Sequence, residues 1–193
     1  MLRGTMKEYI DIVNEKDEVI GVVTRTEMHK NALLHRVSRI IIKNDKNEFL
    51  VQKRSQSKDI FPEYWDIGVA ESVKSGSNYD STAVIGLWEE LGIKLQIEEI
   101  NRVFNFIHKS ENDNEICTVY EIVYNGDLKK QDEEIDEIKF LKMEMVKELI
   151  SSSPFHPVGS IAMDKYLNIS KLNNEKYQNE STSSAAQSEE ESE

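Results

Sequence analysis

Apolar and polar residues alternate along the first third of the chain, with the period of two that is typical of half-buried β-strands. The sequences YIDIV (9–13) and VIGVVT (19–24) flank a polar turn and predict a β-hairpin. The sequences RVSRIIIK (36–43) and EFLVQKR (48–54) flank the turn sequence Asn-Asp-Lys-Asn and predict a second hairpin. Between the hairpins, residues 25–31 can hold a helical turn.

The middle of the chain predicts a strand, a polar loop and a helix. Residues 64–69 are expected to form a short strand, and residues 73–80 a loop. The segment STAVIGLWEEL (81–91) has apolar residues at helical spacing. Asp80 is placed to cap the start of this helix, and Gly92 follows its end as a left-handed residue would.

Strands outnumber helices in the prediction. Further strands are expected at 99–108, 116–124 and 135–141, and further helices at 144–151 and 158–167. Strands and helices do not alternate regularly, which favours the α+β class over a doubly wound sheet.

Apolar periodicity stops near Asn173, which sets the predicted domain boundaries. We expect a flexible N-terminus over residues 1–8, one domain over residues 9–170, and a disordered acidic Ser/Glu-rich tail over residues 171–193.

The charge balance limits the classes of partner. The 193 residues contain 36 Asp and Glu against 24 Lys and Arg, for a net charge of −12. Residues 177–193 contribute five acids and no base, so the rest of the chain carries −7. Non-specific nucleic-acid binding needs a basic surface and is therefore disfavoured. No apolar run approaches the roughly 18 residues of a membrane span, and the start does not resemble a signal peptide. With the lone Cys117, no disulfide framework is expected, and we expect a cytoplasmic protein without a membrane partner.

The segment WDIGVAESVKSGSNYDSTAVIGLWEELGI (65–93) resembles the loop, helix and loop of the Nudix superfamily. The family pattern, called the Nudix box, is a glycine, five residues, a glutamate, seven residues, and then R-E-U-x-E-E-x-G-U, where U is aliphatic. We call its helix the box helix and its matching glutamates the box acids. The matching positions are Leu87, Glu89, Glu90, Gly92 and Ile93. The departures are Glu71 at the leading glycine, Ser77 at the first glutamate, and Ile85 and Gly86 at the R-E pair. Carboxylates one helical turn apart share a face and can hold a divalent cation against a diphosphate.

The flanking sequence resembles the isopentenyl-diphosphate isomerase-like branch of that superfamily. Six segments match in order: the opening hairpin at 9–25, LLHR at 33–36, FLVQKRS at 49–55, KDIFP and YWD within 58–66, EEIDEIKFL at 133–141, and Ser-Pro at 153–154.

The resemblance implies a Nudix fold, in which a mixed β-sheet core is sandwiched between helices. It implies that Glu89 and Glu90 are catalytic and hold Mg²⁺ or Mn²⁺. Arg54 and Lys53 would grip a diphosphate through charge-assisted contacts, and Glu115 would act as a general base or a metal-associated acid. The expected partner is a small-molecule diphosphate, and a homodimer stays open.

Three functions follow from this resemblance, and whether the chain is an enzyme stays open. The first is a metal-dependent hydrolase of a nucleoside-diphosphate-linked or other organic diphosphate, weakened because Ser77 and Gly86 replace two glutamates of the box. The second is a catalytically inactive Nudix-fold module that binds a diphosphate metabolite or a protein.

The third and least favoured function is isopentenyl-diphosphate isomerase. In that comparison His29 and His35 resemble two N-terminal histidine ligands, and Asp113 and Glu115 resemble a later acidic segment. Ala70, however, stands at the position of the catalytic cysteine, and protonation of an alkene needs both an acid and a base.

Overall fold

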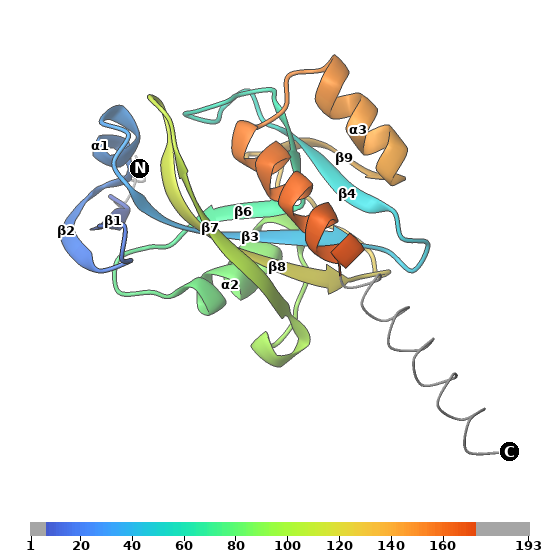
Figure 1. Ribbon diagram of the computed structural model, residues 1–193, viewed down its shortest axis with the longest axis horizontal. Helices are drawn as coiled ribbons and strands as arrows, with labels where there is room; N and C mark the ends of the chain where they lie inside the picture. Colours follow the sequence, from blue (N-terminus) through green and yellow to red (C-terminus); the bar gives the residue numbers. More distant parts are fainter. Residues whose placement is uncertain (1–6, 173–193) are drawn as a thin grey trace, which may run out of the picture.

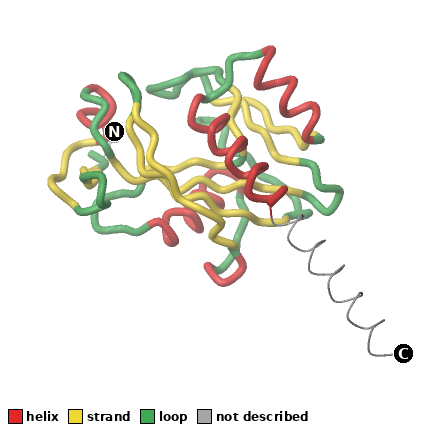
Figure 2. Tube along the Cα trace, in the orientation of Figure 1, coloured by secondary structure: helices red, strands yellow, loops and turns green. Residues whose placement is uncertain are grey.

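A nine-stranded mixed β-sheet forms the centre of the protein, with helices on both of its faces, which confirms the α+β class (Figures 1 and 2). The computed structural model describes residues 7–172, so nearly all of the predicted N-terminal segment and tail lies outside the described residues.

The described strands are β1 (Tyr9–Val13), β2 (Val19–Thr24), β3 (His35–Lys43), β4 (Phe49–Arg54), β5 (Trp65–Ile67), β6 (Val69–Ser72), β7 (Asn101–Lys109), β8 (Asn114–Val123) and β9 (Ile135–Leu141). The helices are α1 (Arg25–Lys30), α2 (Tyr79–Leu91), α3 (Met143–Ser152), the 3₁₀ turn η1 (Ile97–Glu99) and a final helix over residues 157–172.

Strand β3 organises the sheet. It runs parallel to β8 over its whole length, from His35 opposite Glu115 to Lys43 opposite Val123. On its other side it pairs antiparallel with β6, and near its ends it touches β1 and β4. Strands β5 and β9 extend the sheet beyond β4, and β7 extends it beyond β8. One strand therefore carries the connections between both halves of the sheet.

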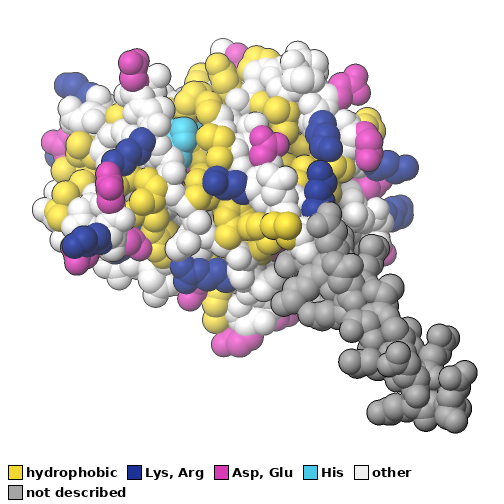
Figure 3. Space-filling model, viewed as in Figure 1, with side chains coloured by type: hydrophobic (Ala, Val, Ile, Leu, Met, Phe, Trp, Pro, Cys, Tyr) yellow, Lys and Arg dark blue, Asp and Glu magenta, His cyan; other side chains and the backbone are white. Residues whose placement is uncertain are grey.

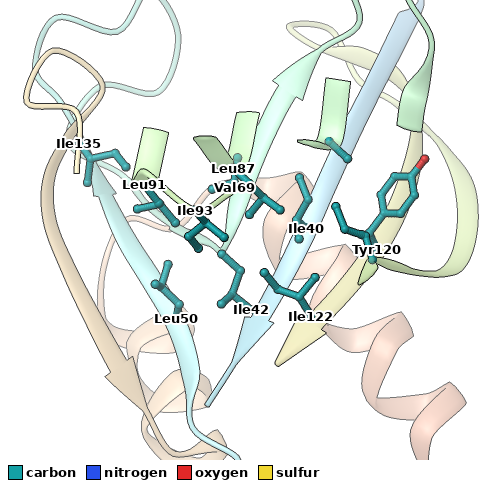
Figure 4. Close-up of a cluster of buried hydrophobic side chains, with 12 residues drawn as sticks. Ile40, Ile42, Leu50, Val69, Leu87, Leu91, Ile93, Tyr120, Ile122 and Ile135 are labelled. Carbon is teal, nitrogen blue, oxygen red and sulfur yellow. The ribbon is translucent and has the colours of Figure 1, made fainter. Parts of the chain in front are cut away.

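Alternation along β3 separates two hydrophobic clusters. Ile40 and Ile42 face α2, and Ile41 faces the opposite side, where α3 and the final helix pack. Figure 4 shows the first cluster, in which side chains from the sheet meet Leu87 and Leu91 of α2. Each fully buried aliphatic side chain contributes about 1.5–3 kcal/mol, so the first cluster fixes α2 on one face of the sheet and the second fixes α3 and the final helix on the other.

Gly68 divides the strand predicted at 64–69 into β5 and β6. Its φ is +60°, and a Cβ atom there would lie 1.8 Å from the carbonyl oxygen of Ile40. Only glycine tolerates both conditions. The break turns the chain so that β5 pairs with β4 while β6 pairs with β3.

Helix α2 begins earlier than predicted, and Asp80 is not its cap. Asn78 caps the helix, because its side chain accepts from the backbone N–H of Ser81 in a capping box. Asp80 lies within the first turn and accepts a hydrogen bond from the hydroxyl of Tyr120. The predicted end is confirmed, since Gly92 adopts a left-handed conformation with φ of 70°.

The strand predicted at 99–108 begins two residues late, because Ile97–Glu99 form the turn η1. The final helix extends to residue 172, five residues beyond its predicted end, and the remaining boundaries lie within two residues of the predictions. Charges of both signs are interspersed on the face drawn in Figure 3. Among residues 7–172, no helix is long and apolar enough to cross a bilayer.

Candidate functional site

An open cleft lies where the end of α2 faces β6 and the loop after β8. Its volume is about 810 Å³. We call this space the open cleft; its walls are Glu8, Arg25, Glu71, Lys74, Trp88, Glu89, Glu90, Gly92 and residues 129–134. The cleft therefore combines the last turn of the box helix with both acidic and basic side chains.

Glu89 and Glu90 occupy different environments in the open cleft. Glu89 is exposed and has no hydrogen bond or ion pair among residues 7–172. Glu90 is only 5% exposed, and its carboxylate accepts a hydrogen bond from the Gln52 amide at 3.3 Å. Burial, followed by the charge of Glu71, raises the pKa of Glu90 to about 8. Glu90 is thus a carboxylate whose ionised form needs a cation nearby.

Cationic side chains surround these acids. Glu8 bridges Arg25 and Lys74, at 3.3 Å and 2.9 Å. Lys130 pairs with Asp132 in the loop after β8. The ammonium of Lys129 makes no hydrogen bond or ion pair within the described part of the chain. Lys129 is therefore free to contact an anionic ligand.

A second, smaller space lies deeper in the protein. We call it the enclosed cavity; its volume is about 40 Å³, and its lining includes Arg25, His29, His35, Arg39, Arg54, Asp66, Ala70, Asp113, Glu115 and His156. Arg25 lines both spaces, so they are neighbours.

His35, Asp113 and Glu115 form a cluster in the enclosed cavity. One ligand atom from each lies within 4.8 Å of the others, and all three residues are buried. Burial raises the pKa of Glu115 to about 8, although the charge of Arg39 acts in the opposite direction. One carboxylate oxygen of Glu115 is buried without a hydrogen-bond partner. Such a mixed nitrogen and oxygen set is able to bind a transition-metal ion.

A buried ion pair between Arg39 and Asp66 forms part of the lining of the enclosed cavity. Arg39 Nη1 lies 2.6 Å from Asp66 Oδ1, and each side chain is 1% exposed. The final helix approaches closely, since a Cβ atom on Gly159 would lie 2.0 Å from Asp66 Oδ1. Glycine at this position allows the helix to pack over the ion pair.

The structure does not bring all the predicted site residues together. Glu89 and Glu90 share the open cleft, whereas Arg54 and Glu115 line the enclosed cavity. The guanidinium of Arg54 donates to the carbonyl oxygens of Phe61 and Ile60, at 3.1 Å and 3.0 Å. Lys53 lines neither space and lies 3.9 Å from Glu63.

The comparisons with known proteins bear on this geometry. A family model described as the NUDIX domain matches residues 33–158. The uncharacterized Nudix hydrolase PA4841 of Pseudomonas aeruginosa is 34% identical over 161 residues, which cover 83% of this chain and 94% of that protein. The chain belongs to the Nudix family.

Solved structures share the Nudix fold. DR0079 from Deinococcus radiodurans aligns with a TM-score of 0.70 at 22% identity, covering 81% of this chain and 98% of that chain. A bifunctional NMN adenylyltransferase/ADP ribose pyrophosphatase from Francisella tularensis, complexed with AMP and Mn ion, aligns with a TM-score of 0.57 at 12% identity. That alignment covers 69% of this chain and 41% of the other.

The donor set of this Nudix domain fits a divalent cation in the open cleft. Glu71, Glu89 and Glu90 supply carboxylate oxygens, which Mg²⁺ and Mn²⁺ prefer. Gln52 is buried beside Glu90, and its amide oxygen has no hydrogen-bond partner. A bound cation would offset the cost of holding these acceptors together.

Sequence reasoning missed the basic wall of this Nudix cleft. Residues 129–134 were expected to be only a loop, yet Lys129 and Lys130 line the cleft beside the end of the box helix, where the backbone N–H of Lys129 donates to Leu91 at 2.9 Å. The available signal was a pair of lysines in the loop after a predicted strand. It did not decide the matter, because paired lysines also occur on ordinary solvated loops.

Proposed function

We propose that the chain is a divalent-metal-dependent hydrolase that cleaves an organic diphosphate, of which a nucleoside-diphosphate-linked compound is the favoured class. The observation that supports this most strongly is the arrangement of the open cleft. The two matching box acids, Glu89 and Glu90, line the cleft together with Lys129, whose backbone N–H donates to Leu91 at the end of α2. A diphosphate needs both kinds of group, one to hold a cation and one to contact phosphate oxygens.

The proposed roles follow from exposure and charge. Glu90, buried and hydrogen-bonded to Gln52, would hold the cation. When bound, that cation would neutralise phosphate charge and lower the pKa of a water molecule. Glu89, exposed and without a partner among residues 7–172, would accept the proton of the attacking water on its carboxylate oxygen. Lys129 would orient the phosphate.

Trp88 favours a nucleoside-linked substrate. Its indole is 53% exposed at the rim of the open cleft. An exposed aromatic ring offers a surface on which a nucleobase stacks.

The isomerase function receives less support. Ala70, at the position of the catalytic cysteine in that resemblance, lines the enclosed cavity with Glu115. Alanine has no proton to donate, so the cavity lacks the cysteine that forms half of the acid and base pair in that resemblance.

The test is monoester release from a panel of nucleoside-diphosphate-linked and prenyl diphosphates. The full chain is incubated with Mg²⁺ or Mn²⁺, and an added phosphatase converts the monoester products to inorganic phosphate. We expect release that EDTA abolishes and that Glu90→Gln lowers by roughly 100-fold or more. Lys53→Gln is the matched control, because Lys53 lies outside the open cleft. If the wild-type chain binds a diphosphate but releases no product, the inactive-module function stands instead.

A further inference from the structure

Positions 71 and 86 carry each other's expected residue. The Nudix pattern has a glycine at the first position and a glutamate at the second, whereas this chain has Glu71 and Gly86. Glu71 lies on β6, and Gly86 is buried within α2. A single replacement would delete a carboxylate, but a reciprocal replacement between facing positions relocates it.

The two positions face each other across a close contact between helix and strand. A Cβ atom on Gly86 would lie 3.4 Å from Glu71 Cβ, 3.4 Å from Val69 Cγ1 and 3.9 Å from Glu71 Cγ. The Cβ alone would make ordinary van der Waals contacts. A longer side chain at position 86 would compete with the side chain of Glu71 for the same space. The pair therefore accommodates one long side chain, and here the strand provides it.

Glycine at position 86 lowers the stability of the helix, because glycine is the least favourable residue in a helix interior after proline. The contacts with Glu71 and Val69 would admit a methyl group at this position and exclude only a longer side chain. The helix lies close to β6 because no side chain stands between them.

The carboxylate of Glu71 belongs to the same cleft as the box acids. It lines the open cleft with Glu89 and Glu90. Among residues 7–172 it makes no hydrogen bond or ion pair, and Arg25 acts on it only through its longer-range charge. A residue present merely to fill space would be apolar, since an acid without a partner is costly inside a protein.

Gln52 provides an independent sign that a ligand is needed here. Its side chain is 3% exposed, and its amide nitrogen donates to Glu90 at 3.3 Å. The oxygen of the same amide is buried and has no hydrogen-bond partner. A buried amide oxygen without a partner, on a side chain that contacts Glu90 through its nitrogen, is of the ligand type that hard cations bind.

We propose that Glu71 supplies from β6 the metal-binding carboxylate that the Nudix box supplies from position 86, so that Glu71 and Glu90 together hold one divalent cation in the open cleft. The proposal rests on the proposed hydrolase function, because it concerns the same cleft. The box of this chain is then rearranged, with three carboxylates at the site, instead of reduced to two.

The first experiment measures Mn²⁺ binding to the full chain without substrate, from the electron paramagnetic resonance signal of free Mn²⁺. We expect Glu71→Gln to weaken binding at least about tenfold. Glu133→Gln is the matched control, since Glu133 is an exposed acid of the same cleft. It should leave the affinity within about twofold of wild type.

The second experiment returns both residues to the family arrangement. Glu71→Gly alone should lose Mn²⁺ affinity as Glu71→Gln does. The double variant Glu71→Gly with Gly86→Glu should recover affinity to within about threefold of wild type. Thermal unfolding, followed by circular dichroism, checks that each variant folds. If Glu71→Gln does not fold, the double variant still tests the proposal.

Two outcomes are distinguishable. Wild-type Mn²⁺ affinity in both single Glu71 variants, with loss of affinity in Glu90→Gln, would overturn the role of Glu71 and leave the hydrolase function standing. A wild-type chain that neither binds Mn²⁺ nor releases monoester would overturn the hydrolase function, and the role of Glu71 with it.

Discussion

His156 is a buried histidine whose surroundings disfavour the charged form of its imidazole. It is 4% exposed and packs its ring 4.6 Å from that of Phe61. Burial lowers its pKa from 6.5 to about 3, although Asp66 acts in the opposite direction. The neighbouring guanidinium groups of Arg39 and Arg54 also disfavour a second positive charge here. The imidazole is therefore neutral in the folded protein throughout the mildly acidic range.

This burial predicts a loss of stability in acid. The unfolded chain protonates His156 below pH 6.5, and the folded chain does so only near pH 3. The free energy of unfolding should therefore fall by about 1.4 kcal/mol per pH unit between these values, or about 2 kcal/mol between pH 6.5 and pH 5. Urea unfolding at pH 7 and pH 5 measures it. His156→Gln should remove this part of the pH dependence, and an equal pH dependence in both proteins would contradict the assignment.

The carboxylates of α2 show what a sequence specifies at the scale of single residues. Glu89 and Glu90 are fixed by their position in a helix whose period is visible in the chain. The pair Arg39–Asp66 could not be predicted, because its partners are 27 positions apart and belong to different strands. The sequence showed that positions 71 and 86 both depart from the family pattern. Only the structure showed that Glu71 and Gly86 lie next to each other.

At the scale of the strands, we expect a substitution at Gly68 to lower the free energy of unfolding strongly. Gly68→Ala would place a Cβ atom 1.8 Å from the carbonyl oxygen of Ile40 and require a left-handed φ of +60°. Strand β6 would have to leave β3, so we expect a loss of more than about 3 kcal/mol in the free energy of unfolding. Urea denaturation measures it.

Gly21→Ala is the matched control for this substitution. Gly21 is exposed on β2, and nothing lies within 4 Å of a Cβ atom built there. Its replacement should change stability by no more than about 0.5 kcal/mol. Equal effects of the two substitutions would show that the close approach at Gly68 is not what holds β6 in place.

Periodicity predicted which elements exist but not where several of them begin. The strand at 135–141 has the predicted bounds, because polar residues flank it on both sides. The break at Gly68 and the capping of α2 by Asn78 were missed. The break depends on an atom of another segment, the carbonyl of Ile40, whereas the cap is a local contact between Asn78 and Ser81.

The molecule as a whole contains two separate polar spaces, and this division predicts separate mutational effects. Glu115 lines the enclosed cavity and is absent from the lining of the open cleft. We therefore expect Glu115→Gln to keep the kcat of monoester release within about threefold of wild type, whereas Glu90→Gln lowers it roughly 100-fold. Steady-state kinetics with the same substrate measure both. A comparable loss in Glu115→Gln would restore its predicted role as a catalytic base.

The candidate site was only partly predictable because it is assembled from distant segments. Sequence reasoning grouped Arg54 and Glu115 with the box acids because the family resemblance implies those roles. The structure instead places Arg54 and Glu115 in the lining of the enclosed cavity and Glu90 in that of the open cleft, with Arg25 common to both. A local pattern does not encode on which side of a shared residue a side chain lies.

The central position of β3 has a consequence for how the protein is made. Its parallel partner β8 begins only at Asn114. During synthesis, β3 therefore emerges from the ribosome long before β8 has been made. Such long-range pairing is slow to form. Until then one edge of β3, with Ile40, Ile41 and Ile42, is open to pairing with any other strand. Premature termination before β8 would therefore yield a fragment that tends to aggregate.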